Sequence, residues 1–322
     1  MKRIYTILVA VISFLSLPSI VYGQSQSLSI YPPVIEVQTT PPSSPQVPIV
    51  VQNNNTENIK LKIELVPFKT DGNTGRVILI PEEGNKGFYP YYKDRIQFLI
   101  DGRKTDTVEL LALESREIIL NINLSKGDPP GDFYYSIVML SDNTEGSESS
   151  ITRIPAGIAT NLLLSIGPKE KAQGGIPEFS TSTFKTNGPV NFKLKLHNAS
   201  SHLINPTGNI EITNMLGQKV GNIKILPQYI LAGSDRYLVS EEQGSPSAEM
   251  ASNLLSNKPQ FTWNEVFLFG FYRATAHVLL EENGNTITST TYFLAFPLYV
   301  FFGLVILLFI LISIYLRVKK KI

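Results

Sequence analysis

The stretch IKLKIEL, residues 59–65, alternates strictly between apolar and charged side chains. A period of two residues places the apolar side chains on one face of a β-strand and the charged ones on the other. Apolar-rich runs of similar length, bounded by Gly, Pro, Asn or Asp, occur at residues 47–51, 118–124, 133–140 and 158–166. The sequence therefore predicts antiparallel sheets with one solvated face, arranged as a sandwich or barrel.

A second block of the same kind follows a polar, turn-rich break at residues 168–176, which we interpret as a linker. Its predicted strands are residues 192–198, 209–213, 220–225, 271–280 and 286–293. The fold class is thus all-β. We expect two tandem Ig-like antiparallel β-sandwiches, residues 24–167 and 177–294, followed by a single transmembrane α-helix.

The two blocks share local patterns. Each has a strand that ends at an asparagine, Asn53 in the first block and Asn198 in the second. Each later has a glycine followed by an aromatic pair, at Gly131 and Gly270. We expect each glycine to permit a tight entry into a strand. We also expect a tyrosine after it to reach back over the sheet corner, as in the tyrosine corner of Ig sandwiches.

A long apolar run lies near each end of the chain. Lys2 and Arg3 precede an apolar run at residues 4–17, so residues 1–23 are predicted to be a secretory signal peptide cut after Gly23. An uncleaved anchor helix is the alternative. Residues 296–316 carry no charge. A helix of about 21 residues is roughly 31 Å long and matches the hydrocarbon core of a bilayer. We therefore predict a transmembrane helix there, with a buried core helix as the alternative.

Four basic residues lie in the last six, residues 317–322. Because positive charge stays in the cytoplasm, this tail is predicted to be cytoplasmic and the two sandwiches extracellular. The expected localisation is the cytoplasmic membrane, crossed once, with the lipid bilayer as a partner of residues 296–316. The residues expected to anchor the chain are Phe296, Leu304, Leu308, Ile312, Arg317, Lys319, Lys320 and Lys321.

The composition argues against several functional classes. The formal net charge is +1 from 28 basic and 27 acidic residues, without a basic stripe, so no nucleic acid is expected as a partner. The chain has no cysteine, which excludes thiol nucleophiles and thiolate metal sites. His197 and His202 have no acidic residue near them in the sequence before Glu211. We therefore predict a protein that is not an enzyme and has no catalytic residues, cofactor or metal.

One segment is a candidate contact site. The long excursion at residues 69–95 ends in rigid aromatic rings beside basic residues, a composition found in protein interfaces and sugar-stacking platforms. The simpler interpretation, which we favour, is that these rings cap the open end of the first sandwich. Trp263 is expected to be a buried residue of the second sandwich. The possible interface residues are Phe88, Tyr89, Tyr91, Tyr92 and Arg95.

The chain resembles bacterial surface proteins of the WxL-interacting type. The resemblance rests on the order of segments and on IYPPVIE (residues 30–36), SREI (115–118) and GDFYY (131–135). It implies a first domain associated with peptidoglycan or WxL proteins and a second that binds host or neighbouring surface proteins. DGNTG (residues 71–75) only approximates an insert typical of the family.

These observations predict a membrane-anchored cell-surface structural or binding protein. Its two Ig-like domains would recognise an envelope protein or a wall polymer non-covalently. The alternative is an envelope assembly factor, or chaperone-like protein, that holds a partner strand by β-augmentation. A free sheet edge around residues 27–31 would favour that alternative. A third class, an enzyme or sensor, is disfavoured by the short tail.

Overall fold

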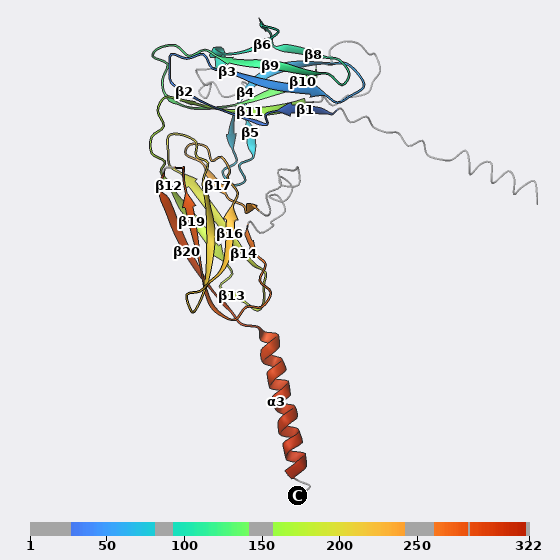
Figure 1. Cartoon of the computed structure of the whole chain (residues 1–322), viewed down its shortest axis with the longest axis vertical. Helices are drawn as coiled ribbons and strands as arrows, with labels where there is room; N and C mark the ends of the chain where they lie inside the picture. Colours follow the sequence, from blue (N-terminus) through green and yellow to red (C-terminus); the bar gives the residue numbers. More distant parts are fainter. Residues whose placement is uncertain (1–26, 81–92, 142–156, 242–260, 283, 320–322) are drawn as a thin grey trace, which may run out of the picture.

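This computed structural model describes residues 27–80, 93–141, 157–241, 261–282 and 284–319. Within them, the elements are strands, one 3-10 turn, η1 (Lys93–Arg95), and one helix, α3 (Leu298–Lys319). Figure 1 shows two sandwiches, the first lying across one end of the second, with α3 leaving the opposite end. The all-β prediction is confirmed. The predicted signal peptide, residues 1–23, lies outside the described residues.

The first sandwich consists of two sheets. Sheet A has the order β1-β3-β9-β6-β7, and sheet B has the order β2-β11-β10-β4-β5 with β8 beside β4. The strands of sheet A are β1 (Leu28–Tyr31), β3 (Gln46–Asn53), β9 (Ser115–Ile122), β6 (Ile96–Ile100) and β7 (Arg103–Lys104). Those of sheet B are β2 (Val34–Thr39), β11 (Gly157–Ile166), β10 (Gly131–Ser141), β4 (Ile59–Thr70), β5 (Val77–Leu79) and β8 (Thr107–Leu110).

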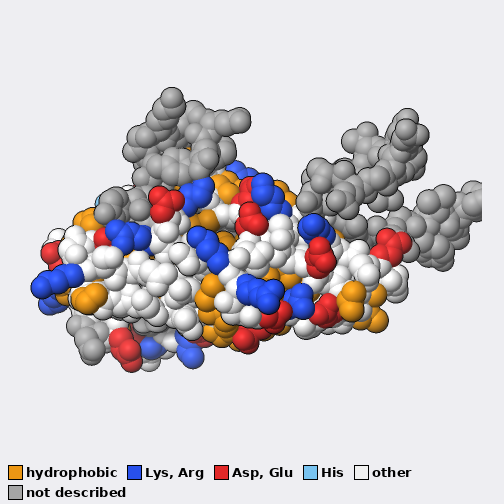
Figure 2. All heavy atoms as spheres, turned by 90° about the horizontal axis from the view of Figure 1, so that it is seen from above, with side chains coloured by type: hydrophobic (Ala, Val, Ile, Leu, Met, Phe, Trp, Pro, Cys, Tyr) orange, Lys and Arg blue, Asp and Glu red, His pale blue; other side chains and the backbone are white. Residues whose placement is uncertain are grey.

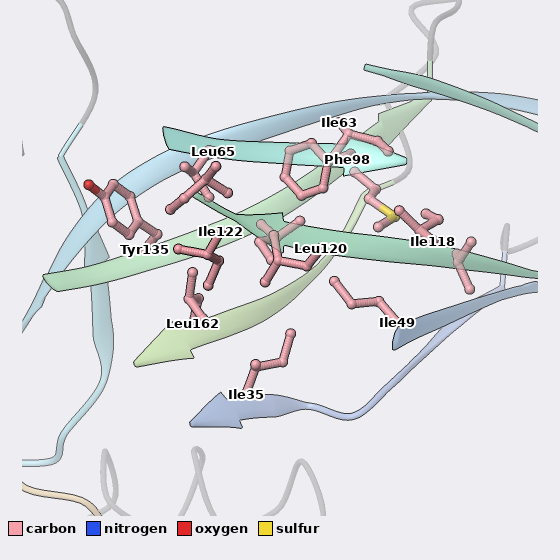
Figure 3. Close-up of a cluster of buried hydrophobic side chains, with 14 of the residues drawn as sticks. Ile35, Ile49, Ile63, Leu65, Phe98, Ile118, Leu120, Ile122, Tyr135 and Leu162 are labelled. Carbon is pink, nitrogen blue, oxygen red and sulfur yellow. The ribbon is translucent and has the colours of Figure 1, made fainter. Parts of the chain in front are cut away.

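The alternation in IKLKIEL behaves as predicted. Leu61, Ile63 and Leu65 of β4 are buried, whereas Lys60 and Lys62 are exposed. Figure 3 shows the apolar side chains of both sheets pointing toward one another in the space between them. Burial of the apolar set against the facing sheet fixes the register of β4, since a slip of one residue would expose it.

The chain changes sheets near its start. β1 pairs antiparallel with β3 in sheet A, and β2 pairs parallel with β11 in sheet B. Pro32 and Pro33 lie between the two strands and have no backbone N–H to give to either sheet. Sheet B is therefore mixed rather than purely antiparallel, which the sequence does not predict, whereas sheet A is antiparallel throughout.

The second sandwich repeats this arrangement. One sheet has the order β12-β14-β17 with β18 beside β14, and the other has the order β13-β20-β19-β15-β16. The strands are β12 (Gly174–Thr181), β13 (Phe184–Lys185), β14 (Val190–Asn198), β15 (Thr207–Asn214), β16 (Lys219–Ile225), β17 (Asp235–Tyr237), β18 (Phe261–Trp263), β19 (Gly270–Leu279) and β20 (Thr286–Ala295). β12 begins inside the range predicted as a linker. Trp263 is buried, as predicted, against Tyr272 and Phe293.

The two predicted entry glycines have backbone conformations that side chains disfavour. Gly131 has φ 146° and Gly270 has φ 100°, each at the first residue of its strand. The tyrosines after them differ. Tyr272 accepts a hydrogen bond from the Phe269 N–H, three residues upstream, at 3.1 Å. Tyr134 instead binds the Ala232 N–H of the second sandwich at 3.1 Å, so this tyrosine is not a corner residue of the first sandwich.

The predicted membrane anchor requires a correction. Over the described residues, no helix has both the length and the apolar character needed to cross a membrane. This finding contradicts the predicted localisation, a single pass through the cytoplasmic membrane with the sandwiches outside and the tail inside. α3 begins at Leu298 rather than at residue 296, because the Phe296 N–H is bound to the Lys185 carbonyl (2.9 Å) as a continuation of the sheet.

The residues predicted as anchors lie on α3, just before it, or outside the described residues. Phe296 lies between β20 and α3, with its ring 5.8 Å from that of Phe269. Leu308, Ile312 and Arg317 lie on α3 with exposed side chains. Leu304 and Lys319 also lie within the bounds of α3. Lys320 and Lys321 lie outside the described residues.

Candidate functional site

β1 forms one border of sheet A. Its four residues pair antiparallel with β3, and no other described strand is hydrogen-bonded to it. The hydrogen bond from the Asn54 N–H to the Ser27 carbonyl (3.0 Å) fixes the phase of this pairing. Ser27, Ser29 and Tyr31 therefore direct their backbone groups toward β3, and Leu28 and Ile30 direct theirs away from it.

The first residues of β11 form a similar border on sheet B. β2 pairs with β11 only from Asn161 to Ile166, and the Asn161 N–H binds the Pro33 carbonyl at 3.3 Å. By the same alternation, Gly157 and Ala159 direct their backbone groups past the end of β2. Among the described residues, these groups have no hydrogen-bond partner. We call β1 together with residues 157–160 the first-sandwich edge.

The first-sandwich edge carries apolar side chains without charges. Leu28, Ile30 and Ile158 are half-buried and pack against the core of the first sandwich. Two other sheet borders carry basic residues, Arg103 and Lys104 on β7 and Lys219 and Lys224 on β16, whereas β5 carries none. Charged side chains on a border strand discourage pairing with another chain. The first-sandwich edge lacks this protection.

The predicted aromatic interface is largely outside the described residues. Phe88, Tyr89, Tyr91 and Tyr92 fall in the segment 81–92, so neither of its two interpretations is tested. Arg95 lies in η1 and forms an ion pair with Asp128, with 3.0 Å between Nη2 and Oδ1. The same guanidinium donates to the Ser125 hydroxyl at 2.8 Å. This arginine therefore ties the start of β6 to the turn before β10.

His197 and His202 each pair with a different carboxylate. His197 Nδ1 lies 2.6 Å from Asp235, and His202 Nε2 lies 3.0 Å from Glu281. His202 is buried, at 4% exposure. In the described part of the chain, no three His, Asp or Glu side chains gather as a metal site would require. Both carboxylates are distant in sequence, so spacing alone did not reveal these pairs.

Replacing His197 with alanine is expected to raise the pKa of Asp235. The hydrogen bond from His197, followed by that from Lys195, holds the pKa of this carboxyl below its ordinary value. Removing the first donor weakens stabilisation of the ionised form. An NMR titration of the Asp235 carboxyl measures the shift. Replacing His277, which lies elsewhere on the same sandwich, is the control and should leave the pKa of Asp235 unchanged.

The surface shows no concentration of one charge sign on the face in Figure 2. Basic and acidic side chains are interspersed there among apolar and polar ones, outside the parts covered by grey atoms. This face therefore lacks the basic stripe that nucleic-acid binding would need.

Among known proteins, the chain is similar only to solved structures. No protein-family model matches the chain, and no curated protein matches it. The E. coli chaperone DraB is 14% identical, with 84% of this chain and 98% of that chain covered and a TM-score of 0.35. The class 5 fimbriae chaperone CfaA is 12% identical, with 84% and 100% covered and a TM-score of 0.36. The Pseudomonas aeruginosa CupB2 chaperone is 9% identical, with 80% and 97% covered and a TM-score of 0.34.

Likenesses at this identity, with TM-scores below 0.5, carry no argument about what the chain binds. They do not support the resemblance to WxL-interacting proteins beyond a shared Ig-like architecture. The description of the sandwiches therefore rests on their own sheets and cores.

Sequence reasoning located one half of the first-sandwich edge and missed the other. Residues 27–31 were identified as the place where a free edge would matter, and β1 lies there. The open start of β11 depends on where β2 begins to pair with it, and the residues of that first pair, Asn161 and Val34, lie 127 residues apart along the chain. No local pattern in the sequence carries that information.

Proposed function

We propose that this protein is a non-catalytic binding protein that holds an extended segment of a partner protein by β-augmentation at the first-sandwich edge. This is the assembly-factor alternative of the sequence analysis. The observation that carries it is the one-sided hydrogen bonding of β1, whose Leu28 and Ile30 backbone groups face away from β3. An added strand would bind those groups and the equivalent ones of Gly157 and Ala159.

The chemistry of the edge indicates the kind of partner. Main-chain hydrogen bonds supply affinity without regard to sequence, and side chains of alternate residues supply selectivity. The half-buried Leu28, Ile30 and Ile158 favour apolar side chains on the inward face of the added strand. The exposed Ser29 and Tyr31 favour polar side chains on its other face. The partner is therefore an extended segment with alternating apolar and polar residues. An envelope protein or wall polymer as the natural partner stays a prediction.

Proline substitutions test this proposal, because proline removes one backbone N–H and is tolerated where that N–H faces solvent. Leu28→Pro and Ala159→Pro are each expected to weaken binding of an alternating valine–threonine peptide by roughly threefold to tenfold, the equivalent of one net hydrogen bond. Fluorescence anisotropy of the labelled peptide, with lysines at its ends, measures the affinity. Unmodified protein that does not bind the peptide saturably would overturn the proposal.

The matched control is Ser29→Pro, one residue away. The Ser29 N–H faces β3, so its loss should lower the thermal stability of the first sandwich, whereas Ala159→Pro, at an exposed side chain, should leave that stability nearly unchanged. Equal peptide affinity for Leu28→Pro and the unmodified chain would also count against the proposal.

A further inference from the structure

Three backbone N–H groups of the second sandwich donate to acceptors on the first. The Leu203 N–H binds the Asp132 carboxylate at 2.6 Å. The Ala232 N–H binds the Tyr134 hydroxyl oxygen at 3.1 Å, and the Tyr237 N–H binds the Asn73 carbonyl at 2.7 Å. Tyr134 in turn donates its own O–H to Asp132 at 2.9 Å. These acceptors come from the start of β10 and from the turn between β4 and β5.

An apolar cluster lies between these hydrogen bonds. Phe68 of β4 and Leu163 of β11 pack against Leu203 and Leu231 of the second sandwich, and each is at most 5% exposed. Burying apolar side chains of this size is favourable, so the cluster opposes separation of the two sandwiches. Tyr134 borders the cluster, and its burial, with the charge of Asp132, raises the pKa of its hydroxyl. The hydroxyl is therefore a neutral donor throughout the ordinary pH range.

The turn between β4 and β5 reaches from the first sandwich to the second, as the position of β5 in Figure 1 shows. Asp71 stabilises this turn internally by accepting the N–H groups of Asn73, Thr74 and Gly75 at 2.8–3.1 Å. Gly75 lies against the guanidinium of Arg236, so closely that a Cβ on Gly75 would collide with it. Arg236 donates to the Tyr229 carbonyl at 2.8 Å.

A fourth contact lies at the far border of sheet B. The Tyr229 hydroxyl donates to Glu36 of β2 at 2.9 Å, and Lys169 approaches the same carboxylate at 3.5 Å. The contacts thus involve β2, β4, β10 and β11, and the β4–β5 turn besides. Because they are spread over the width of a sheet, rotation about any one axis breaks some of them.

We infer that the two sandwiches form one rigid body, in which the second sandwich occupies the outer face of sheet B and the β4–β5 turn braces the joint. This inference is independent of the proposed function. Its consequence is a fixed orientation of the first sandwich relative to the second and to the start of α3, unlike two domains on a flexible linker.

Distance measurements between the sandwiches test the inference. The chain has no cysteine, so spin labels can be placed at Lys60→Cys on β4 and Thr288→Cys on β20, both exposed. The expected result is one narrow distance distribution. Leu203→Asp, which places a charge in the apolar cluster, should at least double its width. A broad distribution in the doubly labelled chain without further changes would overturn the inference.

Amide exchange supplies a second measurement in folded variants. Gly75→Ala and Gly72→Ala lie in the same turn with φ of 74° and 73°, and only the Cβ at position 75 meets Arg236. Gly75→Ala is expected to speed exchange of the Tyr237 amide at least tenfold, whereas Gly72→Ala should have a smaller effect. Equal exchange in both variants would contradict the bracing role of the turn.

A conservative pair of tyrosine variants distinguishes the joint from general stability. Tyr134→Phe removes the hydroxyl that links Asp132 to the Ala232 N–H across the joint. Tyr237→Phe removes a hydroxyl that binds Glu178 within the second sandwich at 2.7 Å. Exchange of the Ala232 amide should accelerate in Tyr134→Phe and stay unchanged in Tyr237→Phe. The opposite pattern would refute the assignment.

Discussion

Replacing Phe293 with alanine is expected to destabilise the second sandwich by about 3–5 kcal/mol, the range for truncating a buried phenylalanine. Phe293 is 2% exposed. Its ring stacks on Tyr272 at 5.0 Å and meets Phe192 and Trp263 edge-on at 6.1 and 6.5 Å. The substitution therefore leaves a cavity beside the rings of Tyr272, Phe192 and Trp263 and removes their contacts with the phenylalanine ring.

Urea unfolding followed by tryptophan fluorescence measures this effect, because the single tryptophan, Trp263, lies beside the cavity. Tyr292→Ala is the matched control. Tyr292 is 64% exposed on the opposite face of β20 and should change the free energy of unfolding by no more than about 0.5 kcal/mol. A loss below about 1 kcal/mol for Phe293→Ala would show that the four rings do not form a packed unit.

Replacing Asn198 with alanine is expected to cost about 3 kcal/mol. The side chain is fully buried, and its amide donates to the carbonyls of His202, Ile230 and Leu231 at 2.9–3.1 Å. Its Oδ1 accepts the Ser200 N–H at 2.9 Å. Alanine leaves these buried groups without partners, and each unsatisfied group costs about 1–3 kcal/mol before the structure relaxes.

Asn53 has the equivalent role in the first sandwich. It is fully buried, donates to the carbonyls of Glu57 and Leu111, and accepts the Asn55 N–H. Asn53→Ala should therefore destabilise the first sandwich comparably. The exposed Asn54, whose side chain donates to the Ser29 hydroxyl at 2.8 Å, is the control and should change stability by less than about 0.5 kcal/mol. Thermal unfolding of all three variants makes the comparison, and equal losses for Asn54→Ala and Asn53→Ala would disprove the explanation.

The two asparagines illustrate what a pattern in the sequence can and cannot reveal. Both were noticed as the last residue of a predicted strand in matching positions of the two blocks. Their partners were not, because Leu111 is 58 residues from Asn53 and Leu231 is 33 residues from Asn198. Strand periodicity describes which face a residue occupies, but not which distant loop lies against it.

Long alternating strands were predicted well and short ones were not. β4, β9, β14 and β20 each cover the range expected from their periodicity, with ends shifted by a few residues. β7 and β13 have two residues each, too few to show a period. β12 begins with Gly174 and Gly175, which lie in the turn-rich range 168–176 and favoured a linker there. Pairing with β14 overrides that local preference.

The candidate site was accessible to sequence reasoning only in part. A free edge at residues 27–31 was recognised as the feature that would favour β-augmentation, and β1 is bound there on one side. The opposite outcome holds for residues 296–316, where apolar composition predicted a membrane span and the described helix does not meet its requirements.

By itself, the sequence determined the all-β character of the chain and the buried face of each long strand, since alternation with a period of two acts within a few residues. The tertiary structure alone decided that β1 and β2 separate into different sheets, that Tyr134 bridges to the second sandwich, and that the first-sandwich edge is open. These features depend on hydrogen bonds and contacts between segments far apart along the chain. Such contacts form only when the sheets close over their cores, so the residues that make them show no periodic pattern in the sequence.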